Sequence, residues 1–106
     1  DIDTVLIEKG VVGGLAAITD KIDNYPGFTE GISGMDLADS LWKQAERFGT
    51  KIEFGEVTSL ETEGTKTRVV TTGKDYIADA VLIATGSDWK KLGIPGEKEY
   101  HKVGVP

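Results

Sequence analysis

One loop constrains this chain more than any other stretch: residues 19–28, Thr-Asp-Lys-Ile-Asp-Asn-Tyr-Pro-Gly-Phe. A proline, a glycine, an amide and aromatic rings lie close together there, and neither helical nor strand periodicity accounts for that order. Asn24 offers both a donor and an acceptor, Thr19 offers a hydroxyl, and a turn over residues 25–27 would hold both groups in place. We interpret this loop as a binding element for a flat ligand.

The composition describes a small, acidic chain without cysteine. Its 106 residues suit a single domain. It carries 18 Asp and Glu against 12 Lys and Arg, so we expect no nucleic acid partner and no membrane partner. The lack of cysteine excludes a disulfide framework, a thiolate metal site and a redox dithiol within the chain, and we expect no metal. No apolar run approaches the roughly 18 residues of a membrane span, so we expect a cytoplasmic protein.

The first strand predicted is residues 5–7, an apolar run typical of a parallel strand buried on both faces. It ends at Glu8, where open parallel sheets place their ligands, and the two oxygens of Glu8 suit the two hydroxyls of a ribose. The alternative is an ordinary solvated strand end. A first strand, a glycine-rich phosphate turn and a helix precede such a strand in dinucleotide-binding units. None precedes it here, so we expect the first strand of the sheet to be missing.

Glycines and a helix follow this strand. Gly13 and Gly14 allow conformations closed to other residues and would let the backbone approach a ligand. Ser33 and Asp36 predict a capped helix start. The helix is expected to turn one apolar stripe to the core and to stop at a glycine; the residues are Leu37 or Ala38, Leu41, Ala45 and Phe48, then Gly49.

Short strands dominate the next part of the chain. Residues 51–60 begin them, and residues 67–72 and 75–78 continue them around a turn at residues 72–74. We predict a three-stranded antiparallel meander. Residues 80–84 then predict a second apolar, parallel, buried strand.

The last third of the chain offers small residues and then a connector. Ala84, Thr85 and Gly86 are small enough for a backbone to approach a ligand at the edge of the sheet. From residue 87 onward, charges, glycines and prolines indicate an extended connector. The single histidine, His101, lies there and is expected to be solvated.

Three stretches resemble the low-molecular-weight thioredoxin reductases, in the right order and over nearly the whole chain. Val5-Leu6-Ile7-Glu8 resembles the second strand of that family with its ribose-binding acid. Gly13-Gly14, Thr19 and Ile22-Asp23-Asn24-Tyr25-Pro26-Gly27 resemble its flavin-contacting loop. Residues 80–86, Ala-Val-Leu-Ile-Ala-Thr-Gly, followed by residues 91–96, Lys-Leu-Gly-Ile-Pro-Gly, resemble a later strand and the turn that leaves the flavin domain.

The resemblance implies an α/β fold, part of a FAD/NAD(P)-binding Rossmann-like domain: a parallel sheet with an antiparallel three-stranded meander, its first strand missing. Residues 1–106 would be a partial FAD-binding domain, with residues 87–106 a connector toward an NADPH and dithiol domain. It also implies cofactor contacts. Glu8 would bind the adenosine ribose, Gly13 and Gly14 would lie along FAD, Thr19 and Asn24 would address the flavin ring, Val57 would meet adenine through its backbone, and Ala84, Thr85 and Gly86 would flank the pyrophosphate.

The resemblance further implies a longer protein, called the parent protein below. It would pass electrons from NADPH through FAD to a redox dithiol and on to thioredoxin, or a similar disulfide protein, as a homodimer. This chain alone would catalyse nothing, and we assign it no catalytic residue. Two alternatives stay open: a ferredoxin-dependent flavoprotein of the same kind, and a non-catalytic FAD-binding module. A plain α/β domain whose glycines are only turns is a third.

Two departures from the family pattern bear on these alternatives. Leu15 stands where the family usually has a glutamine, so one polar contact near the flavin is absent. Residues 102–106, Lys-Val-Gly-Val-Pro, lie where the family runs through Gly-Arg-Gly-Val into its Cys-x-x-Cys. The first departure leaves the electron donor open.

Overall fold

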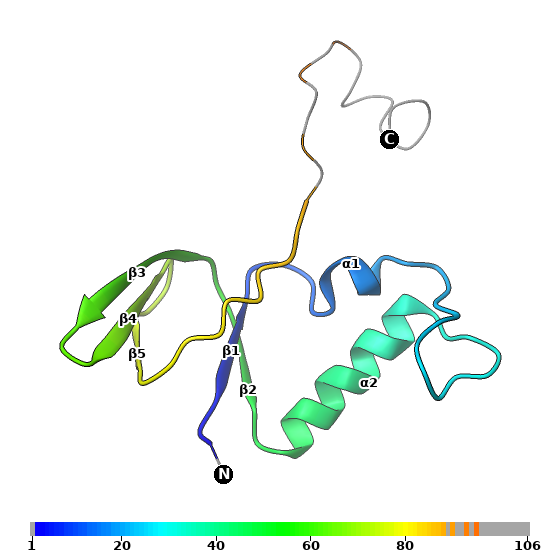
Figure 1. Ribbon diagram of the computed structural model, residues 1–106, viewed down its shortest axis with the longest axis horizontal. Coiled ribbons are helices and arrows are strands. Elements are labelled where there is room, and N and C mark those ends of the chain that lie inside the picture. Colours follow the sequence, from blue (N-terminus) through cyan, green and yellow to red (C-terminus); the bar gives the residue numbers. More distant parts are fainter. Residues whose placement is uncertain (1, 89, 91–92, 94, 96–106) are drawn as a thin grey trace.

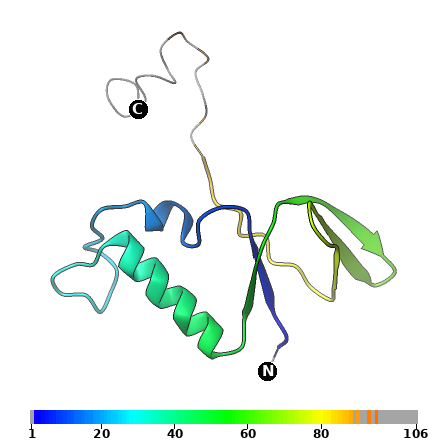
Figure 2. The same cartoon turned by 180° about the vertical axis from the view of Figure 1, so that it is seen from behind.

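A parallel strand pair joined by a helical crossover forms the centre of the molecule, and a separate antiparallel meander flanks it (Figure 1). The computed structural model describes residues 2–88, 90, 93 and 95. Figure 2, from behind, shows the same arrangement: helices on one side of the strand pair and the meander on the other. Among the described residues, no helix has the length and apolarity that crossing a membrane requires.

The strand pair consists of β1 (Val5–Glu8) and β2 (Lys51–Phe54). They run parallel, with Val5 opposite Lys51 and Glu8 opposite Phe54. Parallel strands need a crossover connection, and here it contains α1 (Gly14–Ala17) and α2 (Gly34–Arg47). The predicted first strand is therefore confirmed. It pairs with residues 51–54, which the sequence predicts as the beginning of the short strands.

Helix α2 begins and ends where its sequence predicts. The Ser33 hydroxyl accepts a hydrogen bond of 3.1 Å from the Asp36 amide, which satisfies one of the free N–H groups of the first turn. At the other end Gly49 has a φ of 90°, a conformation that suits glycine and ends the helix. Its amide donates to the carbonyl of Glu46 at 2.9 Å.

The meander consists of β3 (Val57–Glu63), β4 (Lys66–Thr71) and β5 (Tyr76–Ala78), in the order β3-β4-β5. Both pairings are antiparallel, as predicted. Gly64, with a φ of 63°, lies in the turn between β3 and β4. β4 is the middle strand, and its β-branched residues suit a strand that packs on both sides. Val69 at its centre is buried.

The second predicted parallel strand, residues 80–84, is wrong for this structure: the segment carries no strand. Leu82 is 91% exposed and Ile83 69% exposed. A strand exists only where a neighbouring strand accepts its hydrogen bonds, and no described residue pairs with this segment. The apolar run therefore crosses the molecule as an extended, uncovered segment.

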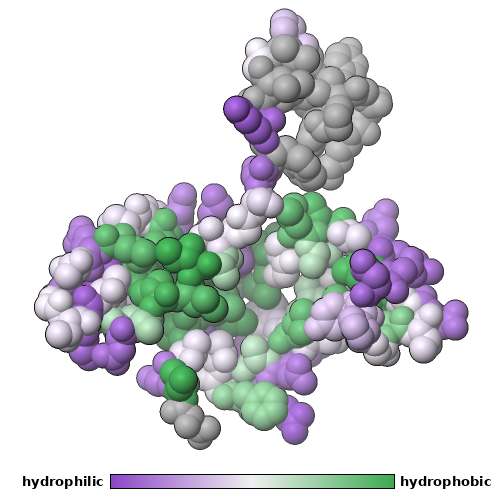
Figure 3. All heavy atoms as spheres, viewed as in Figure 1, coloured by the Kyte–Doolittle hydropathy of each residue, from purple (hydrophilic) through white to green (hydrophobic). Residues whose placement is uncertain are grey.

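The apolar residues of β1 and α2 are also less buried than the sequence predicted. Val5 and Leu6 of β1 are exposed rather than buried on both faces. In the apolar stripe of α2, Leu37 and Ala38 are buried and Ala45 is half-buried, while Leu41 and Phe48 are exposed, Phe48 by 74%. Helix α1 packs against α2, and further along α2 the ring of Trp42 meets that of Phe54 in β2 edge to face, with the ring centroids 6.3 Å apart. Figure 3 shows the resulting apolar side chains gathered over the meander and beside the central strands.

Candidate functional site

The carboxyl ends of β1 and β2 define one edge of the strand pair. Helix α1, the start of β3 and the extended segment after β5 lie along this same edge, uppermost in Figure 1. Ligands of open α/β sheets bind outside the carboxyl ends of parallel strands. The structure therefore brings most of the predicted cofactor residues to the edge where a cofactor is expected.

Glu8 is the last residue of β1 and is half-buried. Its Oε1 accepts a hydrogen bond of 2.8 Å from the Gly10 amide, and its carbonyl accepts one of 3.0 Å from the Gly55 amide. Among the described residues, Oε2 has no hydrogen-bond partner. One oxygen thus orders the side chain, and the other is available to a hydroxyl donor.

Gly13 and Gly14 have left-handed backbones, with φ of 105° and 54°. A Cβ on Gly13 would overlap the Cβ of Ala38 and lie 2.9 Å from that of Ala17, so helix packing alone explains this glycine. A Cβ on Gly14 would meet nothing within 4 Å. Of the pair, Gly14 is the one whose open side leaves room for a ligand.

Thr19 uses its polar groups within the chain. Its hydroxyl donates to the carbonyl of Leu15 at 3.0 Å, and its amide donates to the carbonyl of Ala16 at 3.2 Å. Its own carbonyl accepts from the Gly34 amide at 2.9 Å. The sequence predicts that the Thr19 hydroxyl contacts the flavin. In the structure this hydroxyl donates its hydrogen bond to α1, so only its oxygen remains available, as an acceptor.

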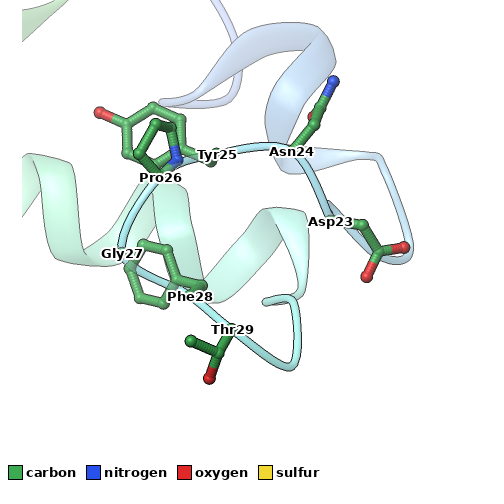
Figure 4. A pocket seen from close by; sticks show the side chains of 7 residues that line it. All are labelled: Asp23, Asn24, Tyr25, Pro26, Gly27, Phe28 and Thr29. Atoms are coloured by element: carbon green, nitrogen blue, oxygen red, sulfur yellow. The ribbon is translucent and has the colours of Figure 1, made fainter.

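Asn24 lies in a loop that forms a shallow concavity of about 270 Å³. The concavity is lined by residues 23–29, and the rings of Tyr25 and Phe28 stand 6.2 Å apart, tilted by 44°. In Figure 4 the Asn24 amide extends away from these rings. No described residue hydrogen-bonds that amide, so both its donor and its acceptor are available.

Val57 opens β3 at the same edge as Glu8. It pairs with Thr71, and an irregularity in the register follows it before Ser59. Just before it, the Gly55 amide bonds the carbonyl of Glu8, so the start of β3 is tied to the end of β1. This connection, which sequence reasoning missed, keeps the two predicted adenosine contacts together.

Ala84, Thr85 and Gly86 lie in the extended segment after β5 and are exposed. Gly86 has a φ of 73°, and a Cβ there would meet nothing within 4 Å. No hydrogen bond between backbone groups fixes the three residues to the rest of the described chain. His101 and residues 96–106 of the predicted connector lie outside the described residues.

Comparison with known proteins decides the family. The sequence pattern of the pyridine nucleotide-disulphide oxidoreductases matches residues 1–105. The chain belongs to this family. It is 41% identical over 106 residues to the thioredoxin reductase of Bacillus subtilis, covering 99% of this chain and 33% of that protein. The chain thus spans about a third of the length of the curated relatives it matches.

Solved structures agree with this membership. The thioredoxin reductase of Lactococcus lactis superimposes with a TM-score of 0.85 at 38% identity, over 93% of this chain and 32% of that one. The thioredoxin reductase of T. acidophilum gives 0.83 at 35% identity, over 94% and 33%. The Rossmann-like α/β fold predicted from the sequence is therefore confirmed, including the parallel strands and the three-stranded antiparallel sheet.

Proposed function

We propose that this chain is the FAD-binding part of a thioredoxin reductase. The observation that carries the proposal is the likeness to thioredoxin reductases over 99% of the chain, which includes every predicted cofactor residue. Residues 1–106 then form part of the FAD domain, with residues 87–106 leading toward the NADPH and dithiol domain of the parent protein. The parent protein acts on thioredoxin, or a similar disulfide protein, as a homodimer.

The residues present fit a flavin dinucleotide. Oε2 of Glu8 offers an acceptor for a ribose hydroxyl, and the open side of Gly14 leaves space along the edge. The Asn24 amide can match a carbonyl acceptor and the ring N–H of an isoalloxazine from one side. Val57 would contact adenine through its backbone, and residues 84–86 would flank the pyrophosphate.

Each of these residues contributes binding and orientation. When bound, FAD supplies the transfer of electrons from NADPH to a dithiol, and the dithiol passes them to the protein disulfide. This chain contains no cysteine, so the dithiol comes from elsewhere in the parent protein. Glu8 holds the adenosine end, and Asn24 orients the ring and sets its polar surroundings.

Anaerobic titration of the parent protein with NADPH tests the proposal. We expect the flavin absorption to bleach, and we expect thioredoxin disulfide to restore it under continued NADPH consumption. A flavoprotein that ignores NADPH but is bleached by reduced ferredoxin would contradict the NADPH assignment. A flavoprotein that reacts with neither donor would contradict the enzymatic assignment altogether.

A further inference from the structure

Gly34, the first residue of α2, is buried directly beneath the backbone of the preceding segment. Its amide donates a hydrogen bond of 2.9 Å to the carbonyl of Thr19. A Cβ built on Gly34 would overlap the carbonyl oxygen of Ala16 and lie 2.5 Å from that of Thr19. Both obstacles are backbone atoms, which cannot rotate aside as a side chain would. Any larger residue at this position must therefore push α2 and the end of α1 apart.

The same contact closes the loop that carries Asn24. Ile22 and Ile32 exchange two backbone hydrogen bonds, of 2.7 and 2.9 Å, and the bond from Gly34 to Thr19 lies beyond them. Residues between these pairs form a compact surface loop whose ends meet. Because these bonds fix both ends of the loop, the position of the Asn24 side-chain amide depends on the distance between the two backbone segments at the base of the loop.

Thr19 is the point at which this base joins α1. Its hydroxyl and amide both bond carbonyls of the preceding turn, while its carbonyl receives the Gly34 amide. A second tight contact lies alongside, where Gly13 leaves no room for a Cβ against Ala38. Helix α1, the loop and the start of α2 are therefore packed as one unit, and Gly34 is where the backbones approach most closely.

We propose that Gly34 is a positioning residue for the flavin: it sets the separation of α2 from Thr19 and thereby the location of the Asn24 amide. This inference rests on the proposed FAD site. Glycine is among the poorest helix formers, so its place at the start of α2 is not explained by helix stability. The close approach of two backbones explains it.

Gly34→Ala in the parent protein tests the inference. We expect FAD affinity to fall about tenfold, the effect of roughly one lost hydrogen bond. We also expect the visible absorption bands of the bound flavin to shift, because the Asn24 amide no longer meets the edge of the ring. Unchanged affinity together with an unchanged spectrum would overturn the inference, since the added methyl group would then have moved nothing that matters to the flavin.

Two control variants separate displacement from simple destabilisation. Gly73→Ala adds the same methyl group where its nearest neighbour, Thr71 Oγ1, is 3.9 Å away. Ser33→Ala weakens the start of the same helix but places no atom beneath the loop. Both are expected to keep the wild-type affinity and spectrum. If the flavin absorption bands shift as far in Ser33→Ala as in Gly34→Ala, the inference is overturned, because loss of helix stability alone would then explain the shift.

If Gly34→Ala does not fold, amide hydrogen exchange in the wild-type parent protein tests whether the base of the loop is held as one unit. The amides of Ile22, Ile32 and Gly34 are expected to exchange slowly, as one unit; rapid exchange of all three would overturn the inference. A wild-type protein that holds no FAD would defeat the proposed function, and the inference with it. A wild-type protein that holds FAD, with a Gly34→Ala variant that holds it equally well, would defeat the inference alone.

Discussion

The carboxylate of Glu8 accepts a hydrogen bond of 2.8 Å from the amide of Gly10, two residues further along the chain. This local contact uses one carboxylate oxygen and turns the side chain across the end of β1. A hydrogen bond to a charged acceptor is stronger than one between neutral groups. The orientation of Glu8 is thus set by the chain itself before any ligand arrives.

Glu8→Gln should weaken FAD binding in the parent protein. The amide oxygen can still accept from Gly10, so the turn is kept, but the ribose loses a charge-assisted contact worth roughly 1.5–3 kcal/mol. Equilibrium titration of the apoprotein with FAD measures the effect. Glu61→Gln, an exposed carboxylate in β3, is the matched control and should bind like wild type. If the Glu8 variant binds FAD as tightly as the wild type does, Glu8 is an ordinary solvated strand end and not a ribose contact.

Asn24→Leu should loosen the flavin or shift its redox potential. A polar edge of the ring left without a partner costs roughly 1–3 kcal/mol. Flavin content after purification and a spectroelectrochemical titration report the two effects. Thr29→Val changes the same concavity at its other end and should alter neither. If both variants behave like wild type, the Asn24 amide does not address the flavin.

Ser33→Ala should lower the stability of the parent protein by about 1 kcal/mol, since the Asp36 amide loses its acceptor. Chemical denaturation measures the change. Ser40→Ala, at an exposed position in the interior of α2, should be neutral or raise stability by a few tenths of a kcal/mol. Equal destabilisation by the two variants would count against the capping role.

Arg68→Lys should loosen the meander. Arg68 makes a two-pronged contact with Glu63, at 2.7 and 2.8 Å, and a weaker one with Asp75 at 3.4 Å. A lysine cannot reproduce the two-pronged geometry. We expect faster amide exchange across β3 and β4, and a smaller difference from wild type in high salt, which screens the pair. Lys66→Arg, which preserves the pair with Asp79, should change neither.

The pH dependence of this ion cluster follows from the same contacts. Glu63 first, and then Asp75, raise the pKa of Arg68. A raised pKa means that the folded state holds the proton more tightly, so the stabilisation is fully present below the unfolded pKa and is lost only as pH rises above it. Arginine titrates far above neutral pH. Titration of Arg68 should therefore cause no change in stability near neutral pH.

Local signals made parts of the fold predictable. Ser33 and Asp36 bond within one helical turn, and Gly49 ends the helix by its own backbone conformation, so their meaning is contained in a few neighbouring residues. The β-branched residues at 67–72 and the turn at residues 72–74 likewise predicted strands of an antiparallel meander, and β4 pairs with both β3 and β5. Partners distant in sequence were not predictable: nothing local in Lys51–Phe54 indicates that it pairs in parallel with β1.

The chemical character of a side chain was easier to predict than its burial or its hydrogen-bond partner. Leu82 and Ile83 have the composition of a buried strand, but burial needs a covering neighbour that composition does not supply. The Thr19 hydroxyl predicts a ligand contact, yet it donates its hydrogen bond to the carbonyl of Leu15. The capping signal at Ser33 predicts where α2 begins, but it does not indicate the close backbone contact at Gly34. A glycine at the first position of a helix was the available signal for a close backbone contact.

The FAD content of the purified parent protein tests the central claim most directly. Protein reconstituted with excess FAD, freed of unbound cofactor and then heat-denatured, releases its flavin for measurement by absorbance. The account predicts about one FAD for each polypeptide, as a single dinucleotide site requires. A properly folded parent protein that releases no flavin would contradict it.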